Sequence, residues 1–284
     1  MRFDAESTGY DSYQKSLKAS AVFLAADYLS HPFGTIWTVQ LAISDQPATF
    51  ANTFKKVRKG GGFYAGFGVQ AATSVPGTFL YFEGRKLSIS LFGDNYFGQS
   101  MQGVLGIACG TALWAPASRV TTLQQASKNS GIDNAFNRLA LPNQLKSIWK
   151  AEGIRGFYRG ALPGTLSAAA TDAIGSLIQA QIVKRYPIDQ QKNFSIQLLA
   201  TWIGYSIATF FLSPIDVCVA RTRIAETDPV NFPDKHFFSA MKTVYRTKAT
   251  RGFFVGLPAG IIHAKLSNLN LPYVESTSLK KNHE

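Results

Sequence analysis

The sequence predicts an all-α membrane protein of six kinked transmembrane helices, arranged as three tandem repeats around a central cavity, with three short helices on the inner face. A pentapeptide recurs as GFYAG at 62–66, GFYRG at 156–160 and GFFVG at 252–256. Its closing glycines are 94 and 96 residues apart, and a proline within an apolar segment precedes each copy. Self-similarity at a fixed period is the mark of a repeat architecture. The chain therefore divides into repeats 1–93, 94–190 and 191–284.

Three stretches without Asp, Glu, Lys or Arg predict membrane spans. They cover 60–82, 95–118 and 193–215, and a helix needs about 20 apolar residues to cross the hydrocarbon core. The alternative is a buried helix of a soluble protein, but three such stretches exceed what one core needs. Gln, Ser, Thr and Gly are frequent inside the spans, which favours helices with one face toward water.

The long helices are expected, in chain order, at 15–44, 62–90, 96–127, 158–185, 194–225 and 254–276. Prolines interrupt the backbone hydrogen bonds of the first, third and fifth helices and predict kinks there; they are Pro32, Pro116 and Pro214. Short helices are expected near 47–58, 142–151 and 236–248. Small residues at matching offsets before the second and third prolines predict close helix packing; they are Gly106, Gly110, Gly204 and Ala208.

The formal net charge of +12 is carried mostly by loops. Fifteen basic residues lie in the loops between paired spans and five in the loops between repeats, which places the more basic loops on the inner side. Contact with anionic lipid explains this charge more simply than nucleic acid does. The two cysteines offer no disulfide framework and no zinc spacing. Because P-loop, GxSxG and metal-ligand motifs are absent, the sequence predicts neither an enzyme nor a bound cofactor.

The prolines and the aromatic–glycine stretches together resemble the mitochondrial carrier family over essentially the whole chain. On each odd helix that family has a proline followed by one acidic and two basic positions. An acidic residue with glycine, then an aromatic, a basic residue and glycine, come later. Pro214, Asp216 and Arg221 match the first pattern, and Glu152-Gly153 with Tyr158-Arg159-Gly160 match the second. The resemblance implies a monomeric, multi-pass protein of the mitochondrial inner membrane that moves a small solute by exchange or uniport.

The charged positions that close the pore in this family are mostly neutral here. The acidic positions hold Gly34, Ser118 and Asp216. The first basic positions hold Trp37, Thr121 and Val219. The usual ring of three ion pairs therefore cannot form. One interpretation is an apolar plug of Trp37 and Val219, with Arg119 or Arg221 paired to Asp216; the other is loss of the closing function.

Each aromatic–glycine stretch is expected to restart a helix, whose first backbone N–H groups point outward. Such a helix end attracts phosphate, and in the family these ends hold cardiolipin. The corresponding residues are Gly66, Tyr158, Arg159, Gly160 and Gly256. The alternative is that the stretches only end loops and anchor aromatic side chains at the membrane interface.

The family's substrate contacts lie on the even helices, seven residues beyond each closing glycine. These positions and their neighbours hold Thr73, Ser167, Ala168, Asp172, His263 and Lys265. An ionisable residue inside a span is a functional candidate, and His263 with Lys265 favours an anion. Histidine also predicts pH-dependent binding. The alternatives are a packing role for His263 and snorkelling of Lys265 to the interface.

Two functions follow from these patterns. The first is transport of a small anionic metabolite, of the nucleotide or carboxylate class, by alternating access. ADP/ATP exchangers carry three arginines and three methionines on the fifth helix, whereas this chain has Arg221-Thr222-Arg223 without methionine, so a standard exchanger of that type is excluded. The second is a degenerate carrier that no longer transports and serves as a membrane adaptor or an insertion or organisation factor. The lost charge ring favours the second.

Overall fold

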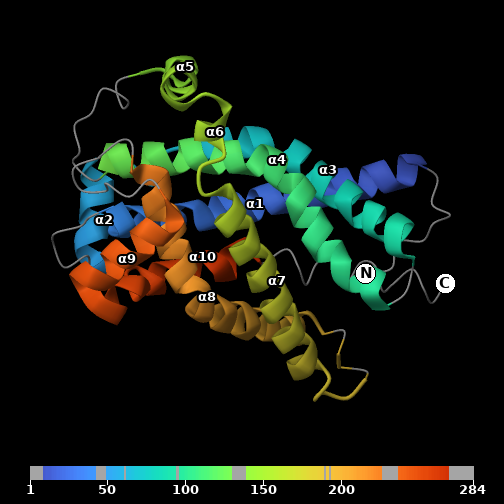
Figure 1. The fold of residues 1–284 in the computed structure, drawn as a ribbon. Helices are drawn as coiled ribbons and strands as arrows, with labels where there is room; N and C mark the ends of the chain where they lie inside the picture. The colour runs from blue at the N-terminus through green and yellow to red at the C-terminus, as the bar shows by residue number, and fades with distance from the viewer. Residues whose placement is uncertain are drawn as a thin grey trace.

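The computed structural model describes residues 9–42, 49–60, 62–93, 96–129, 139–188, 190–191, 193–225 and 236–268. Every regular element in these ranges is a helix (Figure 1). The predicted all-α class is therefore confirmed for the described residues.

Six helices form the body of the described part of the molecule (Figure 1). They are α1 (Gly9–Ala42), α3 (Phe67–Phe92), α4 (Tyr96–Asn129), α7 (Ala161–Val183), α8 (Phe194–Ile224) and α10 (Leu257–Ser267). They pack in a closed ring, each against the next in that order, and α10 returns to α1. The ring brings the first and last helices of the described chain side by side, which encloses a space between all six.

Shorter elements connect the body helices. They are α2 (Phe50–Lys59), α5 (Leu141–Glu152), α6 (Ile154–Phe157), α9 (Phe237–Lys248) and the 3₁₀ helix η2 (Ala249–Phe254). The three predicted short helices correspond to α2, α5 and α9. In Figure 1, α2 and α9 are both seen at the left of the view.

Three body helices begin later than the sequence predicted. Helix α3 starts at Phe67 instead of 62, α7 at Ala161 instead of 158, and α10 at Leu257 instead of 254. The reason is that the aromatic–glycine stretch before each one forms turns or a very short helix, such as α6 and η2. Residues 269–276 of the predicted sixth helix lie outside the described residues.

Small residues allow the body helices to approach closely, as predicted. A Cβ added to Gly106 of α4 would lie 2.9 Å from the Tyr81 ring of α3, and one on Gly204 of α8 would overlap the Gly175 carbonyl oxygen of α7. The predicted prolines Pro32, Pro116 and Pro214 lie inside α1, α4 and α8, where each removes one backbone donor.

Among the described helices, α8 is the one that is long and apolar enough, by length and composition, to cross a membrane. The other body helices carry more polar side chains, such as Asp27 and His31 in α1. The arrangement of six spans in three repeats therefore stays a prediction.

Candidate functional site

The aromatic–glycine stretches end on glycines that start α3, α7 and α10. Gly66, Gly160 and Gly256 have φ of 81°, 70° and 78°, a left-handed conformation that costs a residue with a Cβ about 1–2 kcal/mol. This conformation turns the chain sharply into the next body helix. Glycine is therefore required at the same point of all three stretches.

Each of these glycines also lies against a different body helix. A Cβ on Gly66 would lie 2.9 Å from the Thr121 Cα of α4, and one on Gly256 would lie 2.7 Å from Trp37 Cδ1 of α1. A Cβ on Gly160 would lie 3.5 Å from the carbonyl oxygen of Val219 in α8. Trp37, Thr121 and Val219, the residues at the first basic positions, thus each contact one of the glycines that start a body helix. The contacts are α4 with the start of α3, α8 with the start of α7, and α1 with the start of α10.

Two of these contacts are reinforced. The Thr121 hydroxyl donates a hydrogen bond to the Gly66 carbonyl at 3.2 Å. The Trp37 ring also lies over Gly260, one turn into α10, where an added Cβ would be 3.3 Å from the ring. Trp37 and Thr121 therefore fasten α1 and α4 to the starts of neighbouring helices without any charge.

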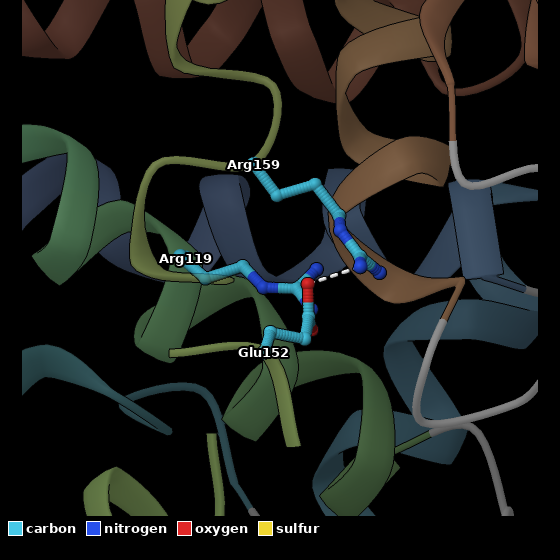
Figure 2. Close-up of polar contacts among 3 residues, drawn as sticks. All are labelled: Arg119, Glu152 and Arg159. Carbon is cyan, nitrogen blue, oxygen red and sulfur yellow. Dashed lines mark hydrogen bonds and ion pairs between the residues drawn. The ribbon is translucent and has the colours of Figure 1, made fainter. Parts of the chain in front are cut away.

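The third contact lies beside a buried charge cluster (Figure 2). Arg119 of α4 and Arg159 approach the carboxylate of Glu152, at the end of α5, from two sides. Arg119 pairs with Glu152 at 3.2 Å and Arg159 pairs with its other oxygen. The Arg119 side chain is only 1% exposed. Arg119 was predicted as one of two partners for Asp216, and the structure pairs it with Glu152 instead.

A cavity of about 610 Å³ lies at the centre of the ring and is lined by all six body helices. Nine of the predicted substrate and gate residues line it, namely Trp37, Thr73, Thr121, Ser167, Ala168, Asp172, Asp216, Val219 and His263. Residues that the sequence separates by more than 200 positions are therefore brought to one wall.

Two predicted residues lie outside the described cavity lining. Lys265 has its Nζ 6.0 Å from the centre of the Trp202 ring of α8, and Arg221 is buried within the protein. Residues two positions apart on a helix point in nearly opposite directions. Because His263 and Val219 face the cavity, Lys265 and Arg221 face away from it.

Two cross-helix contacts occupy equivalent positions in the cavity wall. The Ser167 hydroxyl of α7 donates to the Asp216 carboxylate of α8 at 2.6 Å. His263 of α10 fills the space left by Gly34 of α1, where an added Cβ would be 3.1 Å from the ring. The Nδ1 of His263 lies 3.1 Å from the Ser30 carbonyl, which can only accept, so Nδ1 donates and Nε2 remains available.

The cavity wall also carries ionisable residues that were not predicted, namely Asp27, His31 and Arg223. Asp27 accepts from the Ser74 hydroxyl at 3.5 Å, and the predicted Asp172 accepts from the Tyr205 hydroxyl at 2.8 Å. His31 lies 3.0 Å from the Ala65 carbonyl. Asp27 lies in α1, inside the first predicted span. An ionisable residue inside a span is a functional candidate, and this signal identifies Asp27 from the sequence.

Arg223 is the cation of the described cavity wall. Its stem passes Gly160, and one terminal nitrogen lies 3.1 Å from where a Cβ on Gly164 would be. Because Gly164 has no Cβ, the Arg223 guanidinium can lie against α7 at this position and reach the cavity. Its Nε is buried and has no hydrogen-bond partner in the described part of the chain.

Two of the residues predicted to bind cardiolipin, Tyr158 and Arg159, have protein partners for their side chains. The Tyr158 hydroxyl donates to the Ala112 carbonyl at 2.9 Å, and the charge of Arg159 is directed to Glu152. The N–H groups of Phe67 and Ala161 donate to carbonyl oxygens of the preceding turn, so the other backbone N–H groups at the starts of α3, α7 and α10 are the candidate phosphate ligands. Cardiolipin binding stays a prediction.

Residues 92–188 match the family model described as mitochondrial carrier protein. The chain is 26% identical to mitochondrial substrate carrier family protein E of Dictyostelium discoideum, over 84% of this chain and 86% of that protein. It is 24% identical to an uncharacterised mitochondrial carrier of Schizosaccharomyces pombe, over 75% and 74%. It is 30% identical to mitochondrial thiamine pyrophosphate carrier 1 of Pyricularia oryzae, over 48% and 43%.

Proposed function

We propose that the chain is a mitochondrial carrier that moves a small anionic metabolite across the mitochondrial inner membrane by alternating access; its similarity to carriers of that family supports this proposal. The six body helices are the proposed membrane spans, two from each repeat. The central cavity is the proposed binding site, because transporter sites lie near the midplane where repeats meet.

Arg223 carries the proposal of an anionic solute. A buried guanidinium nitrogen without a protein partner is costly unless a ligand or water satisfies it, and its Nε is such a group at the cavity wall. Arginine binds carboxylate and phosphate through strong, charge-assisted hydrogen bonds. His263 adds a second polar group, since its Nε2 is left available. Lys265 lies away from this wall, so Arg223 replaces it as the main support for an anion.

A second function has one observation in its favour. Thr121 and Trp37 hold the starts of α3 and α10 by close packing against glycine, where the family uses ion pairs that can open and close. A helix ring held by such packing need not open alternately to the two sides of the membrane. The competing function is therefore a non-transporting membrane adaptor or an insertion or organisation factor.

Uptake into cardiolipin-containing liposomes separates the two functions. The labelled solutes are nucleotides, carboxylates and thiamine pyrophosphate, the last because relatives carry that name. Arg223→Gln should lower uptake about tenfold to hundredfold, since a hydrogen bond to a charged group contributes about 1.5–3 kcal/mol. Arg246→Gln, on the exposed face of α9, is the matched control and should not lower it. If no solute enters in a preparation shown to be folded, the adaptor function is favoured.

Lipid and assembly are proposed from the same resemblance. We propose that the purified protein is a monomer, and that cardiolipin phosphates bind the backbone N–H groups at the starts of α3, α7 and α10. Delipidation should then lower the unfolding temperature, and added cardiolipin should restore it more fully than a zwitterionic phospholipid does.

A further inference from the structure

The charges of the cavity wall do not match a simple anion. Among the described residues, the wall holds the carboxylates of Asp27, Asp172 and Asp216 and the single guanidinium of Arg223, besides His31 and His263. An anion without any positive group would meet Arg223 but would be repelled by three carboxylates. The wall is therefore suited to a solute that carries charges of both signs.

The charges are separated along the cavity axis. The Arg223 guanidinium lies beside Gly164 of α7, and Asp172 follows Gly164 by eight residues on the same helix. At 1.5 Å per residue, these groups stand about 12 Å apart along α7. Asp216 lies between them, where it accepts from Ser167.

Asp27 lies toward the same end as Asp172. Its partner Ser74 is eight residues beyond Gly66 on α3, which is about 12 Å along that helix. Asp27 therefore lies about two turns beyond the start of α3, at a depth similar to that of His263, which is seven residues beyond Gly256. The positive end of the cavity is next to the start of α7, and the negative end lies two turns or more beyond it.

The two outer carboxylates are held by neutral donors. Tyr205 donates to Asp172 and Ser74 to Asp27. Within the described ranges, neither carboxylate forms an ion pair with another residue. A partly buried carboxylate with few donors favours a cationic partner. At the other end of the axis, Arg223 is the matching site for an anionic group.

We propose that the transported solute is an extended zwitterion, with an anionic group against Arg223 and a cationic group against Asp172 and Asp27. This inference rests on the proposed function, since it concerns the solute of the same cavity. It narrows the class of anionic metabolites to those that also carry an amine or another cationic group several bonds away. Dicarboxylates and simple phosphate esters fall outside that class.

Two probes of equal length test the proposal in proteoliposomes. Aminohexyl phosphate carries an anionic and a cationic end, and hydroxyhexyl phosphate replaces the amine with a neutral hydroxyl. The wild-type chain should take up the amino probe at least about tenfold faster, as one charge-assisted contact implies. Equal uptake of the two probes would overturn the zwitterion and leave the proposed function intact. Uptake of neither probe by folded protein would overturn the zwitterion, and uptake of the nucleotides, carboxylates and thiamine pyrophosphate then decides separately whether the proposed function fails as well.

Substitutions at the negative end assign the preference to its residues. Asp172→Asn keeps an acceptor for the Tyr205 hydroxyl and removes the charge, so the uptake ratio of the two probes should fall to about one-tenth of its wild-type value or lower. Asp172→Glu keeps the charge and should retain most of the ratio. Asp27→Asn provides an independent test on another helix, in case one variant fails to fold. Glu83→Gln, a half-exposed carboxylate on α3 paired with Lys86, is the control and should leave the ratio unchanged. A wild-type ratio in both Asn variants would overturn the assignment.

Discussion

At the start of α7, two arginines converge on the carboxylate of Glu152, whereas at the starts of α3 and α10 a neutral side chain is pressed against a glycine. The three starts share the same left-handed glycine and the same kind of preceding stretch. The charged start lies within residues 92–188, the segment that matches the family model. The same turn can therefore be held by buried charge or by close packing.

The two ways of holding a helix start differ in what disrupts them. A buried ion pair is lost when one partner is removed, because the remaining charge stays buried. A glycine contact is lost when volume is added, because the opposing helix cannot give way. Removing a charged group should therefore be most harmful at the start of α7. Adding a methyl group should be most harmful at the starts of α3 and α10.

The largest effect is expected for Glu152→Gln. Removing the carboxylate leaves the side chains of Arg119 and Arg159, 1% and 15% exposed, without their common acidic partner. The free energy of unfolding should fall by about 3–5 kcal/mol, measured by thermal unfolding in detergent. Glu83→Gln breaks a half-exposed pair with Lys86 and should cost about 1 kcal/mol or less. Equal unfolding temperatures for the two variants would show that the α7 start does not depend on its charges.

An intermediate effect is expected when a methyl group is added to the glycines. Gly66→Ala and Gly256→Ala combine left-handed strain of about 1–2 kcal/mol with an overpacking cost of about 1–3 kcal/mol. Gly160→Ala should show the strain alone, because its Cβ would stand at an ordinary 3.5 Å from Val219. The unfolding temperatures of the three variants give the comparison. If Gly160→Ala proves the most harmful of the three, the contrast between packing and charge is wrong.

The smallest effect is expected for Lys265→Gln. Lys265 lies near Trp202 and outside the described cavity lining, so solute uptake should stay within about twofold of wild type, the range of a change of less than 0.5 kcal/mol. His263→Asn, two residues earlier on the cavity side, should lower uptake clearly because it removes the Nε2 that His263 offers to the solute at the cavity wall. Loss of uptake in Lys265→Gln alone would restore the lysine as the anion ligand and remove Arg223 from that role.

Much of the site was predictable because the helix starts repeat. Counting seven residues from Gly66, Gly160 and Gly256 led to Thr73, Ser167 and His263, and all three line the cavity. Counting two and five residues from the prolines led to Asp216, Trp37, Thr121 and Val219, which also line it. The offsets are those that the resemblance to the mitochondrial carrier family implies, and the repeated glycines and prolines are the landmarks from which they are counted in this chain.

The side chains whose positions the sequence did not predict are those of Lys265, Arg223 and Arg119, for which no repeated glycine or proline indicated the direction of the side chain. Lys265 was grouped with His263 because the two are close in sequence, yet a helix turns by about 100° per residue and carries them to opposite faces. Arg223 was not predicted, since it lies beyond the proline pattern. Its approach to Gly164 and its position in the cavity wall are visible only in the structure. Arg119 was predicted, as an alternative to Arg221, to pair with Asp216, whereas the structure pairs it with Glu152.

By itself, the sequence determined the helical class, the approximate positions of the body helices and the recurrence of the glycine starts. These are local properties, set by hydrophobic spacing, by proline and by the left-handed conformation that glycine tolerates. Only the tertiary structure decided which side chains meet: Thr121 with Gly66, Trp37 with Gly256, His263 with Gly34, and two arginines with Glu152. Such contacts depend on the rotation and depth of each helix relative to its neighbours, which are set by the packing of the whole ring.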